Sequence, residues 1–197
     1  MAKIELSPEE LHLVTNASFI LTKNIIVQKV YTLFGELSES YRSLTDTYNI
    51  QAFEGALSPK ISKGENYEGL PWVMLDQPRL FSNTNVLAIR TFFWWGNFFS
   101  ITLQLSGESL NRYLPSLKAL HKETAGNVWY LCYSEDAWQH HFRADNYKPL
   151  HTFGEDEIMG LKFIKLAQKI PIQQWGGVGL FLQKAYEDIL QILQNAQ

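Results

Sequence analysis

The chain begins with apolar residues at helical spacing. Ser7, Pro8 and Glu10 are arranged as in a capping box with proline at the first helical position, which predicts a helix start. The spacing then predicts helix to about residue 35, with a break near 16–18, and a shorter helix over 37–46. We therefore expect N-terminal helices within residues 8–47.

The middle of the chain changes to the alternating, aromatic and β-branched runs that are typical of strands. Five such runs are predicted, and a helix over 109–124 separates the fourth from the fifth. The runs are SPKISKG (58–64), LPWVMLD (70–76), VLAIRTFFWW (86–95), FFSITLQL (98–105) and NVWYLCYS (127–134). We therefore expect the sheet within residues 58–134.

Helical patterns return at the end of the chain. An acidic first turn predicts a helix over 155–170, and an apolar stripe predicts another over 178–194, so that C-terminal helices occupy 155–194. Helices flank the strands instead of alternating with them, which predicts the α+β class. We expect an antiparallel β-meander sheet of about five strands, with N- and C-terminal helices packed on it, in a single globular domain over 1–197.

The stretch RTFFWWGNFFS, residues 90–100, carries six aromatic rings around a Gly-Asn pair. A two-residue hairpin turn at 96–97 is predicted from that pair. Because side chains alternate along a strand, this register places Arg90, Phe92 and Trp94 on one otherwise apolar face. The same register leaves three rings on a mixed face near the tip: Phe93, Trp95 and Phe98.

Arg90 is the single charge on the predicted apolar face, and a buried arginine needs an anionic partner. One interpretation is an internal ion pair with Asp76 or Glu65, the nearest acidic candidates in sequence. The other is contact with the carboxylate or phosphate of a small anionic ligand, in a pocket between the aromatic sheet face and the helices. The candidate ligand-binding residues are Arg90, Trp72, Tyr67, Glu65, Asp76, Trp94 and Phe92.

Two alternative functions stay open. The aromatic hairpin 92–99 would suit an interaction protein or a homodimer, because aromatic residues are enriched in interfaces. The five histidines would suit a metal-dependent hydrolase, but none has a metal-ligand spacing such as H-E-x-x-H, so no residue is assigned to a metal. The sequence identifies no cofactor and does not decide whether the protein is an enzyme.

Composition narrows the classes of partner. The formal net charge is −3 and no basic run occurs, which argues against nucleic acid as a partner. Lysine and polar residues interrupt the most apolar early stretch, residues 17–35, so we expect no membrane segment. With Cys132 as the single cysteine no internal disulfide can form, and we expect a cytoplasmic protein.

Overall fold

We describe a computed structural model of the chain, and the structure describes residues 4–122 and 128–195. The helices are α1 (Pro8–Thr15), α2 (Ala17–Tyr48), α3 (Gly107–Lys122), α4 (Glu155–Met159) and α5 (Val178–Gln194). Short 3-10 helices are η1 (Gln51–Phe53), η2 (Leu150–Thr152) and η3 (Ile172–Gly177). The strands are β1 (Lys60–Tyr67), β2 (Leu70–Phe81), β3 (Val86–Trp94), β4 (Phe98–Ser106), β5 (Tyr130–Cys132), β6 (Tyr147–Pro149) and β7 (Phe163–Pro171).

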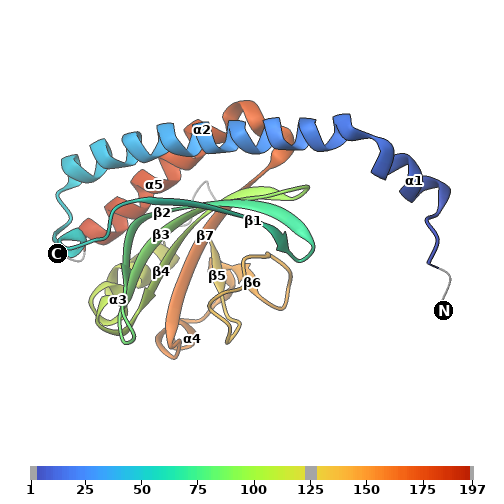
Figure 1. Cartoon of the computed structure of the whole chain (residues 1–197). Coiled ribbons are helices and arrows are strands. Elements are labelled where there is room, and N and C mark those ends of the chain that lie inside the picture. Colours follow the sequence, from blue (N-terminus) through green and yellow to red (C-terminus); the bar gives the residue numbers. More distant parts are fainter. Residues whose placement is uncertain (1–3, 123–127, 196–197) are drawn as a thin grey trace.

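The seven strands form one antiparallel sheet in the order β1-β2-β3-β4-β7-β5-β6. Figure 1 shows α2 and α5 along one face of this curved sheet. β5 and β6 form one edge of the sheet, which curves away from these helices. The predicted α+β class with helices packed on an antiparallel sheet is confirmed. The predicted number of about five strands is too low, because β6 and β7 were not expected.

The sheet face toward the helices forms the main hydrophobic core. Leu75, Phe93 and Ile101, from successive strands, are at most 1% exposed there. Tyr41 of α2 and Tyr186 of α5 stack with their ring centroids 3.8 Å apart, which joins the two helices over the sheet. Burial of this apolar surface is the main stabilising contribution from this side of the sheet.

The first two helices begin where their capping residues predict. The Ser7 hydroxyl accepts the N–H of Glu10, and the Glu10 carboxylate accepts the N–H of Ser7, which completes the capping box. The predicted break is confirmed at Asn16. The predicted end near residue 35 is wrong: α2 continues to Tyr48, because its buried apolar stripe persists past Gly35 and outweighs the low helix propensity of glycine.

The predicted helix over 155–170 is wrong. Only α4 is helical there, and β7 follows as an inner strand between β4 and β5. The buried apolar residues Ile164, Leu166 and Ile170 recur at even spacing, which is the period of a strand. Pairing with two neighbouring strands overrides the helix propensity of the Lys, Gln, Leu and Ala residues in this segment.

Other boundaries shift by smaller amounts. β2 extends past the predicted run 70–76 to Phe81, and Gln77 there accepts a hydrogen bond from Ser38 of α2 at 2.5 Å. α3 runs through Pro115. The predicted end of that helix at 123–124, and the predicted strand start at 127, lie outside the described residues. The C-terminal helix over 178–194 is confirmed as α5.

The hairpin between β3 and β4 has a three-residue turn, 95–97, with Gly96 at φ 73°. The predicted two-residue turn is therefore wrong, and a shift of one residue moves every β4 side chain to the opposite face relative to β3. Arg90 pairs with Thr102 and not with an apolar residue. It consequently shares its face with three polar side chains of β4: Ser100, Thr102 and Gln104.

Candidate ligand-binding face of the sheet

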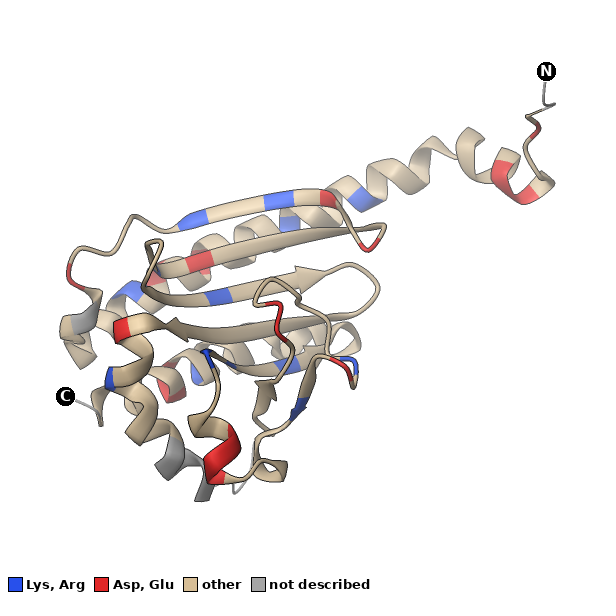
Figure 2. Ribbon diagram, turned by 90° about the horizontal axis from the view of Figure 1, so that it is seen from below, with Lys and Arg blue, Asp and Glu red and all other residues tan. Residues whose placement is uncertain are grey.

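The sheet face turned away from α2 and α5 is covered by a loop. This loop, residues 133–146, connects β5 to β6 and crosses in front of the strands in Figure 2; we call it the strap. Beneath it, strand pairing places Asp76, Arg90, Thr102 and Ala167 in one row across four strands. We call this side of the sheet the strap-covered face.

Arg90 forms an internal ion pair. Its Nε lies 2.7 Å from Asp76 Oδ1 and its Nη2 lies 3.4 Å from Asp76 Oδ2, and both residues are 8% exposed. Trp138 of the strap lies over the guanidinium, with its ring centroid 5.8 Å from Cζ. Of the two predicted acidic candidates, Asp76 therefore pairs with Arg90, whereas Glu65 pairs with Lys23 of α2 at 2.7 Å.

The four predicted aromatic residues lie together on the strap-covered face. Tyr67 contacts Phe92 and Trp94 edge to face, with centroids 5.8 and 5.1 Å apart, and Trp72 packs beside them. The indole of Trp72 lies across Gly64, where a Cβ would approach its ring atoms to 2.5 Å. This cluster faces the strap, which places these residues away from the helices and corrects the expected position of the pocket walls.

The strap is fastened to the first two strands. The Tyr67 hydroxyl accepts the backbone N–H groups of His140 at 2.7 Å and His141 at 3.1 Å. Arg143 forms two hydrogen bonds with the Glu68 carboxylate, at 2.7 and 2.6 Å. Glu68 is presented by the β1–β2 turn, where it has φ 51°. Bidentate arginine–carboxylate contacts fix orientation as well as distance, so the strap is held in one register on the sheet.

Lys165 is buried beneath the strap, and His140 of the strap packs against the sheet. Lys165 is 1% exposed, and its Nζ donates a hydrogen bond to the backbone carbonyl of Gln139. Burial lowers the pKa of Lys165 to about 8, and the nearby positive charge of Arg90 adds to this effect. Burial also lowers the pKa of His140 far below 6.5, and its ring packs on Phe92 with centroids 4.9 Å apart. Burial therefore disfavours the charged form of both groups.

Cys132 lies beside this cluster as a buried thiol. It is fully buried, and its Sγ lies 3.2 Å from Asn146 Oδ1, to which it can donate a hydrogen bond. Burial raises the pKa of the thiol. A raised pKa disfavours the thiolate that a cysteine nucleophile requires, so the arrangement fits a packing role for Cys132.

Lys169 lies further along β7 in an aromatic environment. Its Nζ is 4.9 Å from the ring centroid of Phe142, 5.3 Å from Tyr130 and 5.8 Å from Phe98. The side chain is half-buried, and burial lowers its pKa. A cavity of about 420 Å³ adjoins it, with mainly apolar walls formed by Phe98, Val128, Tyr130, Pro171 and Phe181.

Gln168 lines the same cavity and lacks hydrogen-bond partners. It is 1% exposed, and within the part of the chain that the structure describes neither Oε1 nor Nε2 has a partner. β5 pairs with β7 only through Tyr130 and Leu131, opposite Ala167 and Leu166, so this short strand leaves room beside the end of β7. A buried carboxamide without partners costs free energy.

Of the three rings that were expected on the mixed face, Phe93 is buried, and Trp95 and Phe98 are half-buried. Phe93 is 1% exposed in the main core, and Trp95 packs against that core. Phe98 lies on the opposite face, where it contacts Trp94 and Phe142 edge to face.

Sequence reasoning missed Lys165, Gln168 and Lys169. All three belong to the segment that was assigned to a helix, in which no strand face could be defined. The even spacing of Ile164, Leu166 and Ile170 was the available signal for their placement.

Across residues 4–122 and 128–195, no group of three or more His, Cys, Asp or Glu side chains is arranged to hold a metal ion. In the same residues no helix is both long enough and apolar enough to cross a membrane. Comparison of the chain with protein-family models, curated proteins and solved structures finds no match.

Proposed function

We propose that the protein binds a small molecule with one anionic group on an apolar or aromatic body, in the cavity beside Lys169. The observation that carries this proposal is a half-buried ammonium that lies among three aromatic rings at the edge of an apolar cavity. An anion there would pair with Lys169, and the apolar body would lie against Phe98 and Tyr130. Mostly apolar walls with a few polar groups are the usual composition of small-molecule sites.

Gln168 supports the same proposal. It is one of the residues that line the cavity, and neither the donor nor the acceptor of its buried carboxamide has a partner among the described residues. Arg90, which was the expected anion contact, is occupied by Asp76. We therefore assign Arg90 a supporting role beneath the strap and propose Lys169 as the direct contact.

Isothermal titration calorimetry on the full chain tests the proposal with benzoate and phenyl phosphate as anionic probes and benzyl alcohol as the neutral probe. We expect saturable binding of at least one anionic probe and none of the alcohol. Lys169→Met should weaken that binding at least about tenfold, because charge-assisted contacts are the strong ones. Lys162→Met, which alters an exposed lysine just before β7, is the matched control and should bind as the wild type does.

Equal affinity of the wild type and Lys169→Met, or no saturable binding of either anionic probe, would contradict the proposal. Gln168→Leu provides an independent check. Removal of a buried carboxamide without partners should raise the free energy of unfolding by about 1 kcal/mol while weakening probe binding. If Gln168 served only packing, its substitution would not raise the free energy of unfolding and at the same time weaken probe binding.

A further inference from the structure

The first part of the chain extends away from the sheet as a helical arm. Figures 1 and 2 show α1 and the start of α2 projecting beyond the strands. No residue of α1 is buried, and the buried residues of α2 begin at Val27. We call residues 4–25 the arm.

The arm is apolar as well as exposed. Nine of its large hydrophobic side chains are 48–94% exposed: Ile4, Leu6, Leu11, Leu13, Val14, Phe19, Ile20, Leu21 and Ile25. Ile20 continues the helical stripe that is buried against the sheet at Val27 and Val30. The same apolar stripe of α2 is therefore buried against the sheet from Val27 onward and exposed to solvent in the arm.

An arm of this kind needs a partner. An eight-residue helix such as α1 is marginal in water by itself, even with its capping box. The exposed apolar side chains of the arm offer on the order of 800 Å² of surface, which is one partner's share of a standard interface. Patches of this size on soluble proteins usually mark an interaction site.

The charges of the arm favour a second copy of the chain as that partner. Glu9 and Glu10 lie in α1 near the tip, whereas Lys29 lies in α2 just beyond the arm. Figure 2 shows acidic residues at the far end of the arm and basic residues along α2. If the two arms were parallel, their acidic tips would lie together and repel each other. If they are antiparallel, each acidic tip lies beside the basic part of the partner's α2. The acidic tip also disfavours an anionic lipid surface, for which amphipathic helices carry Lys and Arg.

We propose that two copies of the chain associate through their arms, antiparallel and related by a twofold axis near Phe19. With this register Leu13 lies opposite Ile25 of the partner subunit, and Glu9 lies opposite Lys29 of the partner subunit. A twofold axis repeats each contact, so every pair counts twice.

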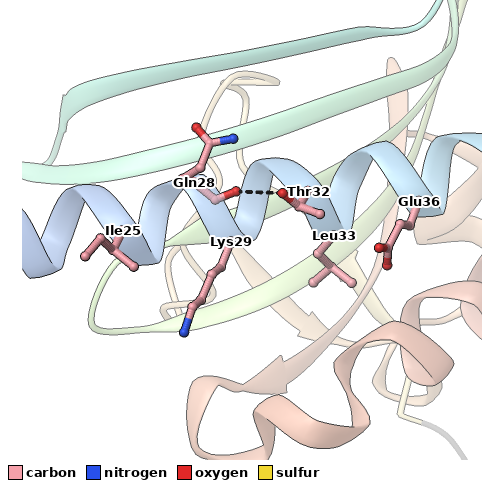
Figure 3. A pocket seen from close by; sticks show the side chains of 6 residues that line it. All are labelled: Ile25, Gln28, Lys29, Thr32, Leu33 and Glu36. Carbon is pink, nitrogen blue, oxygen red and sulfur yellow. Dashed lines mark hydrogen bonds between the residues drawn. The ribbon is translucent and has the colours of Figure 1, made fainter.

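The part of α2 that follows the arm offers a surface for the partner's α1. One cavity of about 370 Å³ follows the side of α2, and another of about 390 Å³ lies between α2 and the hairpin tip. Lys29 lines both cavities, and Figure 3 shows Ile25, Lys29 and Leu33 pointing to the same side of α2. Trp95 and Trp175 add apolar wall to the second cavity.

Size-exclusion chromatography with light scattering on the untagged full chain tests the proposal. We expect twice the chain mass of 22.7 kDa for the wild type and the single mass for the variant Phe19→Glu, Ile20→Glu. Both side chains are about half exposed, so these substitutions leave the core intact. Leu57→Glu, at a similarly exposed position outside the arm, is the matched control and should remain a dimer.

Charge reversal tests the register. Glu9→Lys and Lys29→Glu should each weaken the dimer several-fold, and the two together should restore it, because the pair then has reversed but complementary charge. A monomeric wild type, or a dimer of unchanged affinity in the Phe19, Ile20 variant, would overturn the proposal. So would a monomer that sediments with phosphatidylglycerol vesicles, since that result assigns the arm to a lipid surface.

Discussion

The two faces of the sheet are built from the same strands but are stabilised by different interactions. Toward the helices, Leu75 and Phe93 are buried among other apolar side chains, and their position requires only matching shape. Toward the strap, Arg90 and Lys165 are nearly as buried, so each needs a defined polar partner. Buried polar groups are costly without partners, and among the described residues neither polar atom of the Gln168 carboxamide has one, which is why this part of β7 is proposed as a ligand site.

The largest expected effect comes from breaking the buried ion pair. Arg90→Met leaves the Asp76 carboxylate buried without its partner, and we expect the free energy of unfolding to fall by about 3–5 kcal/mol in urea denaturation. The added change Asp76→Leu should recover part of that loss. Arg42→Met, which removes an exposed pair with Glu39, is the control and should cost less than about 1 kcal/mol.

An equal, small cost for Arg90→Met and Arg42→Met would contradict the difference between the two faces. A folded and stable Arg90→Met protein that loses probe binding would instead return Arg90 to the role of ligand contact.

The next largest effect concerns the fastening of the strap. Tyr67→Phe removes the hydroxyl that accepts the N–H groups of His140 and His141, and we expect a loss of about 2 kcal/mol. Hydrogen exchange should show faster exchange of those two amides, with the amides of α5 little affected. Tyr48→Phe, whose hydroxyl bonds to Glu187, is the control for removal of a hydroxyl on the helix side. Unchanged exchange at 140 and 141 would show that Tyr67 does not hold the strap.

A smaller effect is expected from pH. His140 has its pKa lowered far below 6.5 in the folded state, so below pH 6.5 the unfolded chain takes up a proton that the folded chain does not. Stability should therefore fall as the pH drops below 6.5. His140→Phe removes this dependence and should lessen the loss between pH 7 and pH 5.5 by about 1 kcal/mol. An identical pH profile of stability for the wild type and His140→Phe would contradict the lowered pKa of His140.

The features that the sequence predicted correctly are local ones. The capping box at Ser7 and the apolar stripe of α5 are local patterns, and both placed their helices correctly. Asp76 was recognised as a partner for Arg90 because the two strands are neighbours in sequence. Such short-range features depend on few residues, so a single sequence is enough to predict them.

The candidate site depended on longer-range features. The three-residue turn at 95–97 moved Arg90 from an apolar face to a polar one. β7 was mistaken for a helix, because its strand character is stabilised by β4 and β5, which lie far from it in the chain. Lys169 and Gln168 acquire their surroundings only through that pairing and through Phe142 of the strap.

The most direct test of the central claim is the pKa of Lys169, measured by NMR on the ε-carbon of selectively labelled lysine and assigned with Lys169→Met. We predict a pKa below 10.5 in the free protein, because burial disfavours the charged ammonium. Addition of phenyl phosphate or benzoate should raise this pKa, whereas benzyl alcohol should not, since only an anion stabilises the charge. A Lys169 pKa that is the same with and without the anionic probes would contradict the assignment of this cavity as an anion-binding site.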